Sequence, residues 1–209
     1  MDLIDTYHKL DYDSGGWYNT TWCNVNVQKS PNDILRMNEL ISKVRPTVII
    51  ETGTMHGGSA YMYATFMDIL KIKGKIYSID IINRVAELPK YKTYINYIVG
   101  SSTDTDLVDE LKSKIRSNDV VMVILDSDHR MDHVLREMYL YAELVTVGSY
   151  MIVEDGNING HPVLRRWGAG PYEALEKFLV QDEHFEIDTD IEHRYLFTYF
   201  PSGFLKKIK

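Results

Sequence analysis

Short apolar runs rich in β-branched residues alternate along the chain with longer segments of helical periodicity. Such runs are typical of buried strands in a parallel sheet, and the segments between them are long enough for crossover helices. We predict strands at residues 48–50, 76–79, 95–99, 120–125 and 150–153. We predict helices at residues 59–72, 104–115, 131–145 and 171–179. The pattern therefore predicts an α/β fold with a doubly wound, open sheet covered on both faces.

The N-terminal part of the chain departs from this alternation. Residues 1–29 have no steady period, yet Trp17, Tyr18 and Trp22 are large apolar side chains that a disordered tail does not usually carry. We therefore expect an ordered N-terminal arm over residues 1–29, followed by a core over residues 30–209.

Regular signals begin at Ser30, a good N-cap, and at Pro31, which suits the first helical position. We expect this helix to end before Pro46. Near the other end, residues 185–187 and 195–200 flank a polar turn and predict a terminal antiparallel hairpin that needs no helix between its strands. We expect residues 1–209 to form a single domain.

Composition and charge narrow the class of function. Hydrophobic residues make up 44% and charged residues 25%, which is typical of globular proteins, and the net charge is -7, so we expect no nucleic-acid partner. No apolar run approaches the roughly 18 to 20 residues that cross a bilayer, and the N-terminus lacks a secretory pattern. Because Cys23 is the single cysteine, an internal disulfide and a cysteine zinc cluster are excluded. We expect a cytoplasmic location and no membrane partner.

Polar residues follow the predicted strands, at the edge where doubly wound sheets bind ligands. The first strand is followed by Glu51-x-Gly53-x-x-x-Gly57-Gly58, and Asp80 ends the second strand. Glycines let a ligand approach the backbone closely. An acid at the end of the second strand can accept hydrogen bonds from both hydroxyls of a ribose. We therefore predict an adenosine-containing cofactor. Each glycine alone would also suit an ordinary turn, and the spacing disfavours NAD and ATP. The predicted cofactor residues are Glu51, Gly53, Thr54, His56, Gly57, Gly58, Ser59, Asp80, Ser101, Ser102 and Asp126.

Four carboxylates follow two strands that we expect to be neighbours in the sheet. They are Asp126, Asp128, Glu154 and Asp155, and Arg130 is the only obvious local counter-charge. Carboxylates held close together repel unless a cation lies among them, and oxygen ligands suit Mg²⁺, with Mn²⁺ close behind. We predict that these four residues bind the metal. Alternatively, Asp128 caps the next helix and Asp126 accepts backbone amides.

His129 lies beside these carboxylates and is the candidate general base, or else a residue that orients a metal ligand. The stretch 157–170 resembles a loop that closes over a substrate. Aromatic side chains could form a wall for a sugar or a planar ring, although core packing would also explain them. These side chains are Trp17, Tyr18, Trp22, Trp167 and Tyr172.

At this point the sequence resembles a known family, the cephalosporin hydroxylase-like and rhamnosyl O-methyltransferase group of class I S-adenosylmethionine-dependent methyltransferases. The resemblance covers about residues 20 to 205, and the matching strings follow one another in order. They include Glu51-Thr-Gly-Thr-Met-His-Gly-Gly-Ser-Ala60, Ile124-Leu-Asp-Ser-Asp-His129, Val153-Glu-Asp155, Asn159-Gly-His-Pro162 and Gly168-Ala-Gly-Pro-Tyr-Glu-Ala174. The resemblance implies a Rossmann-like fold, S-adenosylmethionine at the glycines, Asp80 and Ser102, and Mg²⁺ at Asp128, Glu154 and Asp155.

A more distant similarity to catechol O-methyltransferases points to Asp126 rather than Asp128 as the metal ligand after the fourth strand. The same comparison places His129 where those enzymes have a lysine base, and Glu154-Asp155 where they have Asp-Asn. Both aspartates therefore stay as candidates, with a slight preference for Asp128, which we also predict to be catalytic with His129. Catechol is disfavoured as the substrate.

These observations predict a Mg²⁺-dependent O-methyltransferase that acts on a hydroxyl of a sugar, a glycan or a small natural product. His129 would remove the proton from that hydroxyl. The alternatives are a metal-dependent hydroxylase-like enzyme and a non-catalytic subunit that binds S-adenosylmethionine. An aromatic-rich arm also makes a homo-oligomer an expectation.

Overall fold

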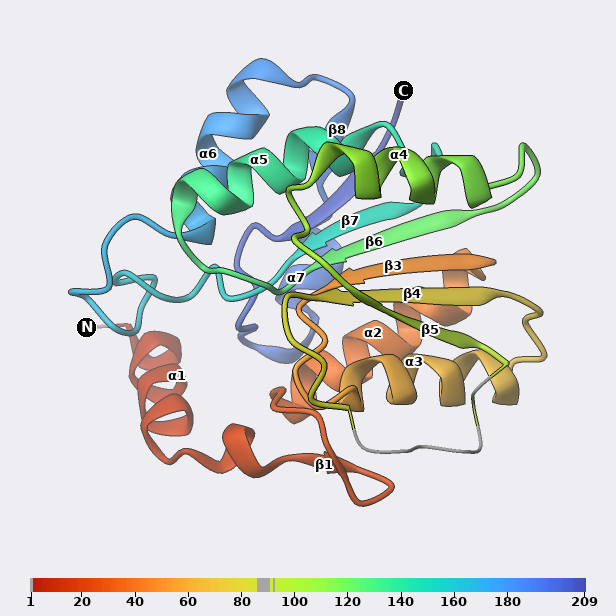
Figure 1. Ribbon diagram of the computed structural model, residues 1–209. Coiled ribbons are helices and arrows are strands. Elements are labelled where there is room, and N and C mark those ends of the chain that lie inside the picture. Colours follow the sequence, from red (N-terminus) through yellow and green to blue (C-terminus); the bar gives the residue numbers. More distant parts are fainter. Residues whose placement is uncertain (1, 86–90, 92) are drawn as a thin grey trace.

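The computed structural model describes residues 2–85, 91 and 93–209. Its main sheet has seven strands in the order β5-β4-β3-β6-β7-β9-β8, and β9 is antiparallel to both of its neighbours (Figure 1). The doubly wound topology predicted from the sequence is confirmed. The strands are β3 (Val48–Thr52), β4 (Lys75–Asp80), β5 (Ile95–Val99), β6 (Val121–Leu125), β7 (Tyr150–Val153), β8 (Phe185–Ile187) and β9 (Phe204–Lys207).

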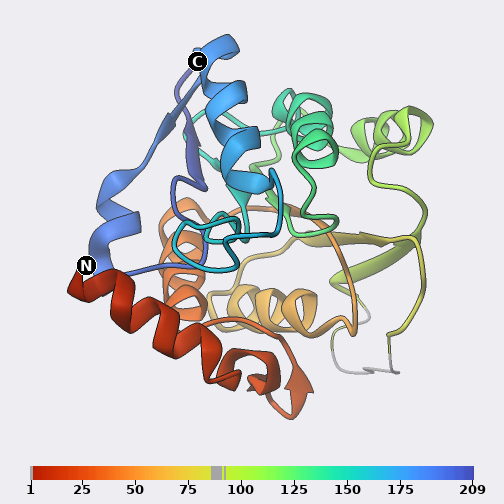
Figure 2. The ribbon, with the colours of Figure 1, turned by 90° about the vertical axis from the view of Figure 1, so that its left-hand side faces the viewer.

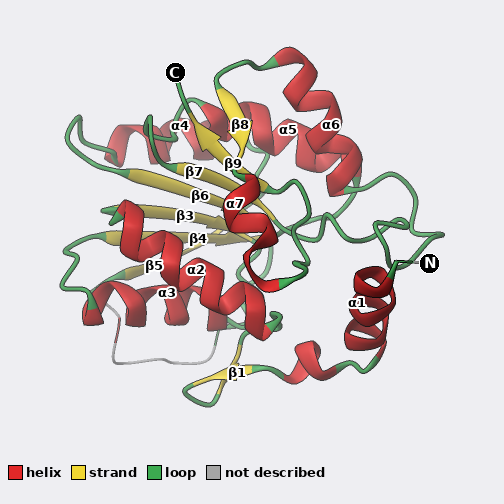
Figure 3. Ribbon diagram, turned by 180° about the vertical axis from the view of Figure 1, so that it is seen from behind, coloured by secondary structure: helices red, strands yellow, loops and turns green. Residues whose placement is uncertain are grey.

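Helices cover both faces of this sheet, as Figure 3 shows from behind. Alternate residues of a strand point to opposite faces, so Ile49 packs with α2 and α3 while Ile50 packs with α4 and α5. Both side chains are fully buried, which explains why the central strands have continuous apolar sequences. One face carries α2 (Pro31–Val44), α3 (Gly58–Ile69) and α7 (Thr189–Glu192), and the other carries α4 (Thr105–Lys114), α5 (Met131–Ala142) and α6 (Pro171–Gln181).

The C-terminal hairpin is present, but the prediction of its second strand was wrong. The helix α7 and the 3-10 helix η3 (His193–Tyr195) follow β8, and β9 begins only at Phe204. Residues 197–200 are all buried rather than alternately exposed. The buried carboxylate of Asp33 accepts hydrogen bonds from the amide of Tyr199 and the hydroxyl of Thr198, which holds this segment as a loop.

The N-terminal arm contains α1 (Leu3–Asp13), the 3-10 helix η1 (Gly16–Asn19), β1 (Thr21–Trp22) and β2 (Val25–Asn26). Figure 2 shows α1 along one side of the molecule, beside the loop that follows β7. His8 is hydrogen bonded to Asn157 at 3.0 Å, and Tyr12 stacks on Trp17. No helix was predicted here from the sequence. Leu3, Tyr7 and Leu10 do follow a helical spacing, but the structure leaves this apolar face of α1 exposed.

None of the helices in the described residues is both long enough and apolar enough to cross a membrane.

Candidate active site

A pocket of about 680 Å³ opens at the carboxyl ends of the parallel strands. The chain runs outward from β3 to β4 on one side and returns to β6 on the other, so β3 and β6 flank the topological switch point, where doubly wound sheets bind ligands. Most of the predicted cofactor residues line this pocket. They are Gly53, Thr54, His56, Gly58, Ser59, Asp80, Ser101, Ser102 and Asp126, whereas Glu51 and Gly57 lie behind it.

Residues 53–58, which lead from β3 into α3 and are called the glycine loop, contain two glycines that allow close backbone contacts. Gly53 has a φ of +88°, and a Cβ there would lie 1.8 Å from the carbonyl oxygen of Asp126. A Cβ on Gly58 would lie 1.8 Å from the carbonyl oxygen of Asn26, in the arm. The loop is therefore in contact with the end of β6 on one side and with the arm on the other.

Asp80, at the end of β4, is oriented by two backbone amides. Its Oδ2 accepts from the Met55 amide at 2.9 Å, and its Oδ1 accepts from the Ile82 amide at 3.1 Å. Each carboxylate oxygen keeps a further lone pair for a donor in the pocket. The contact with Met55 joins the end of β4 to the glycine loop.

Glu51 is fully buried beneath the glycine loop. The hydroxyl of Ser78 donates a hydrogen bond to it at 2.5 Å, and its other carboxylate oxygen is buried without a partner among the described residues. Burial raises the pKa of Glu51 to about 7. Glu51 thus lies behind the pocket wall and reaches it through Ser78, which also bonds to Thr54.

Ser102 is held by residues of α5. Its hydroxyl lies 3.2 Å from Nε2 of His133, and its carbonyl oxygen accepts a hydrogen bond from the hydroxyl of Tyr141 at 2.9 Å. The neighbouring Ser101 is bonded instead to Thr103, at 3.0 Å. These contacts fix the loop after β5 against α5, and the contact of His133 with Ser102 was not predicted from the sequence.

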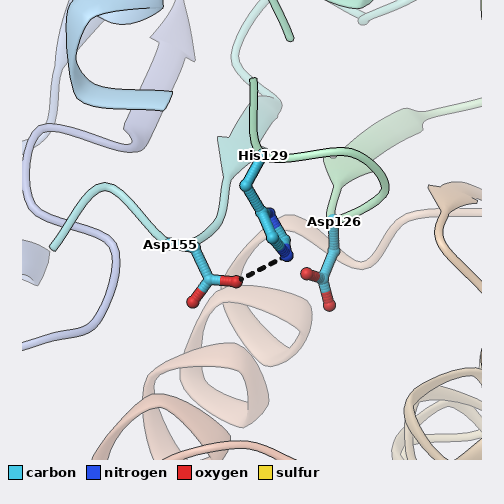
Figure 4. A group of neighbouring side chains, drawn as sticks. All are labelled: Asp126, His129 and Asp155. Carbon is cyan, nitrogen blue, oxygen red and sulfur yellow. Dashed lines mark ion pairs between the residues drawn. The ribbon is translucent and has the colours of Figure 1, made fainter. Parts of the chain in front are cut away.

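Three predicted metal or catalytic residues converge in the pocket. Figure 4 shows the imidazole of His129 between the carboxylates of Asp126 and Asp155, with all three side chains pointing toward one another. One ligand atom from each residue lies within 4.8 Å of the other two, and Nε2 of His129 lies 3.2 Å from Asp155. The arrangement provides two carboxylates and one imidazole to a divalent cation.

The charge of this group acts on the proton affinity of His129. Burial lowers the pKa of His129, but the negative charges of Asp155, Asp126 and Asp128 outweigh it, so the pKa lies above its usual value. A neighbouring carboxylate stabilises an imidazolium in this way. The group therefore favours transfer of a proton to His129.

The remaining predicted metal ligand, Glu154, is paired with a lysine that the sequence analysis missed. Lys29 donates a hydrogen bond to Glu154 and a second one, at 3.0 Å, to Asp126. The expectation that Arg130 is the only local counter-charge was therefore wrong. Burial lowers the pKa of Lys29, but Asp126 and Glu154 raise it well above its usual value. A sequence signal existed: Lys29 is the only basic residue between Lys9 and Arg36.

Asp128 lines the pocket but is not brought into the group of Asp126, His129 and Asp155. Its carboxylate accepts hydrogen bonds from the guanidinium of Arg130, at 2.5 to 3.0 Å, and from the Arg130 amide. The side-chain hydrogen bond from Arg130 lowers the pKa of Asp128 to about 2.

The expected aromatic wall is divided between the pocket and other contacts. Trp17, Tyr18 and Trp167 line the pocket, whereas Trp22 packs edge-on against Phe66 in the core. Tyr172 stacks on His161 at 3.8 Å between ring centroids. The loop 157–170 also contributes Ile158 and Leu164 to the pocket, so this loop and the arm both form part of its lining.

The sheet order, the glycine loop and the acidic residues beyond β6 and β7 define a class I methyltransferase fold. A sequence model of the family "Rhamnosyl O-methyltransferase/CmcI" matches residues 14–208. Rhamnosyl O-methyltransferases of Mycobacterium tuberculosis and Mycobacterium leprae are each 36% identical to this chain over 97% of its length, which corresponds to 84% and 90% of theirs. The chain belongs to the rhamnosyl O-methyltransferase/CmcI family.

A solved structure of CmcI described with Mg and SAM shares the fold. Its TM-score is 0.71, its sequence is 18% identical, and the match covers 92% of this chain and 78% of CmcI.

Proposed function

We propose that this chain is an S-adenosylmethionine-dependent, Mg²⁺-dependent O-methyltransferase whose acceptor is a hydroxyl of a sugar or a small natural product. One observation carries the proposal: a single pocket is lined by the glycine loop with Asp80 and also by Asp126, His129 and Asp155. The mycobacterial relatives are named rhamnosyl O-methyltransferases, and the CmcI structure is described with Mg and SAM, which supports this choice of substrate and cofactors.

The residues present fit both groups. Gly53 and Gly58 both line the pocket, where they pack against the backbone of Asp126 and Asn26, and Asp80 is oriented beside them by two amides. For the cation, Asp126 and Asp155 offer oxygen ligands of the kind that Mg²⁺ prefers. Glu154 adds a buried carboxylate oxygen, Oε1, that has no partner among the described residues.

When bound, S-adenosylmethionine supplies the methyl group and Mg²⁺ supplies positive charge that lowers the pKa of the acceptor hydroxyl. Asp126 and Asp155 would hold the cation, which leaves the imidazole of His129, placed between them, to accept the hydroxyl proton. Gly53, Gly58 and Asp80 would hold S-adenosylmethionine in the same pocket, where it would supply its methyl group to the acceptor oxygen. Trp17 and Trp167 line the same pocket and help to exclude water from it.

The test is methyl transfer from isotope-labelled S-adenosylmethionine to a panel of rhamnosides, other glycosides and phenols, with Mg²⁺ or with EDTA. We expect label to appear on a sugar hydroxyl only when the metal is present. Asp155→Ala is expected to abolish this turnover while leaving the affinity for S-adenosylmethionine largely intact.

Two results would overturn the proposal. Transfer that is equally fast in EDTA and in Asp155→Ala would remove the metal from the reaction. A purified protein that does not bind S-adenosylmethionine at all would remove the cofactor, and with it the assignment of the glycine loop and Asp80.

A further inference from the structure

Lys29 introduces a buried positive charge into the acidic part of the pocket. Its side chain is only 1% exposed, and its ammonium contacts Glu154, whose side chain is 3% exposed, and Asp126, which is 23% exposed. The ammonium also lies 5.8 Å from the centre of the Phe200 ring. A lysine is rarely buried to this extent unless its charge is compensated, and here two carboxylates compensate it.

The backbone brings Lys29 to this place from the arm rather than from the sheet. Gln28 has a φ of +51°, and the helix α2 begins at Pro31, so the chain turns sharply on either side of Lys29. Just before Lys29, Asn26 and Val27 pack directly on Gly58 of the glycine loop. One short segment therefore joins the glycine loop to the carboxylates beyond β6 and β7.

Without Lys29, the carboxylates in this region would carry more negative charge than one divalent cation neutralises. With His129 neutral, as a base must be, Asp126, Glu154 and Asp155 contribute up to three negative charges, and Lys29 reduces them to two, the number that a divalent cation neutralises. Lys29 also occupies Oε2 of Glu154 and leaves Oε1 buried and without a partner among the described residues. The ammonium thus both neutralises and orients the carboxylate that has the least access to solvent.

We propose that Lys29 sets the charge of the metal centre: its ammonium compensates one of the three carboxylates, so that the remaining negative charge matches one divalent cation. This inference rests on the proposed function, because it requires a cation at Asp126 and Asp155. Lys29 itself precedes α2, far in sequence from β6 and β7, which the three acids follow.

Removal of the Lys29 ammonium is expected to strengthen cation binding, whereas general damage to the site would weaken it. The ammonium and a divalent cation repel each other across a few ångströms, so removing the ammonium strengthens cation binding. We expect Lys29→Met to bind Mn²⁺ at least about tenfold more tightly than the wild type, because unscreened charges at such distances interact by more than about 1.4 kcal/mol. Loss of packing alone would instead weaken Mn²⁺ binding.

The measurement is titration of the full-length protein with Mn²⁺, following the free ion by electron paramagnetic resonance. Lys29→Gln, which keeps N–H donors without the charge, is expected to show the same gain as Lys29→Met. The matched control is Lys112→Met, since Lys112 pairs with Glu143 on the surface and its loss is expected to leave Mn²⁺ affinity unchanged. Melting curves without metal are expected to show a lower melting temperature for Lys29→Met, recovered on adding Mn²⁺.

Restoring the charge gives a further arm of the experiment. Lys29→Cys in a Cys23→Ser background can be alkylated with 2-bromoethylamine in denaturant, where the buried position becomes accessible, and then refolded; this rebuilds an ammonium at the same distance from the backbone. We expect Mn²⁺ affinity to rise in the unmodified cysteine variant and to return to the wild-type value after alkylation. This arm applies equally if Lys29→Met proves insoluble.

The outcomes separate the inference from the proposed function. If the wild type binds no Mn²⁺ or Mg²⁺, the proposed metal dependence fails and the inference fails with it. If the wild type binds Mn²⁺ but folded Lys29→Met and Lys29→Gln bind it equally or more weakly, the inference alone is overturned.

Discussion

Asp126 and Asp128 are two residues apart, yet their carboxylates have different partners. Asp126 lies with His129 and Asp155, whereas Asp128 is paired with Arg130. We expect Asp126→Asn to lower metal-dependent turnover by at least about 100-fold, since even indirect partners of metal ligands cost 10- to 100-fold. Asp128→Asn is expected to cost far less, because Arg130 already neutralises this carboxylate.

Steady-state rates at several Mg²⁺ concentrations would check this pair of variants. Asp126→Asn should also require more Mg²⁺ to reach half of its maximal rate. A larger loss in Asp128→Asn than in Asp126→Asn would restore Asp128 as the metal ligand, the preference drawn from the sequence.

Glu51 makes the stability of the protein depend on pH. Because burial raises the pKa of Glu51 from 4.5 to about 7, its contribution to folding is present below about pH 4.5 and is lost as the pH rises through about 7. Glu51→Gln keeps the shape and removes the charge. We expect its free energy of unfolding to match the wild type at about pH 5 and to exceed it at about pH 8, by on the order of 3 kcal/mol at most.

Denaturant unfolding at the two pH values measures this difference directly. The same offset between Glu51→Gln and the wild type at both pH values would show that Glu51 does not change its ionisation in this range.

Single residues were predictable where their role depends on local chain geometry. The positions of Gly53 and Asp80 in the pocket could be predicted because a strand end followed by a tight turn fixes where they lie. Lys29 could not be assigned, since its partners Asp126 and Glu154 are 97 and 125 residues away in sequence. Likewise, the separation of Asp126 from Asp128 depends on the Arg130 side chain, whose direction no periodicity encodes.

At the scale of elements, a buried ion pair joins α2 to the C-terminal segment. Asp33 and Arg36 are fully buried, and Nη1 of Arg36 lies 2.9 Å from Oδ1 of Asp33. Asp33 also accepts hydrogen bonds from Thr198 and Tyr199, and Arg36 donates to the carbonyl oxygen of Ile191. The pair therefore holds α7 and residues 197–200 against α2.

Removing one member of this pair leaves the other charge buried and unpaired. We expect Asp33→Ala to lower the free energy of unfolding by about 3–5 kcal/mol, as for other broken buried pairs. Denaturant midpoints would measure this loss. The double variant Asp33→Ala with Arg36→Met is expected to recover part of it, because no unpaired charge remains. A double variant less stable than Asp33→Ala would contradict this account.

The strands were easier to predict than the segments at the two ends of the chain. The central strands are buried on both faces, so their composition alone identifies them. By contrast, α1 exposes Leu3 and Leu10, and the backbone amides of Tyr199 and Phe200 donate to Asp33 and to the Thr198 hydroxyl rather than to a strand. Both depend on tertiary contacts, which outweigh local propensity.

At the scale of the whole molecule, the pocket collects residues from the arm to the segment before β9, from Tyr12 to Phe200. Asp80 ends β4 and Asp155 follows β7, and the strands β3 and β6 lie between them in the sheet. Three strand spacings separate the two positions by about 14 Å. Binding at one end should therefore be nearly independent of a substitution at the other.

This separation predicts that cofactor and metal stabilise the protein through different residues. A ligand at about 100 times its dissociation constant adds about 2.7 kcal/mol, which raises the melting temperature of a protein of this size by about 5–10 °C. We expect Asp80→Ala to lose the rise caused by S-adenosylmethionine and to keep the rise caused by Mg²⁺, and Asp155→Ala to show the reverse. Melting curves with each ligand alone measure both effects. If either substitution removed both rises, the two ligands would share one site or bind only together, and the division of the pocket between β4 and β7 would be wrong.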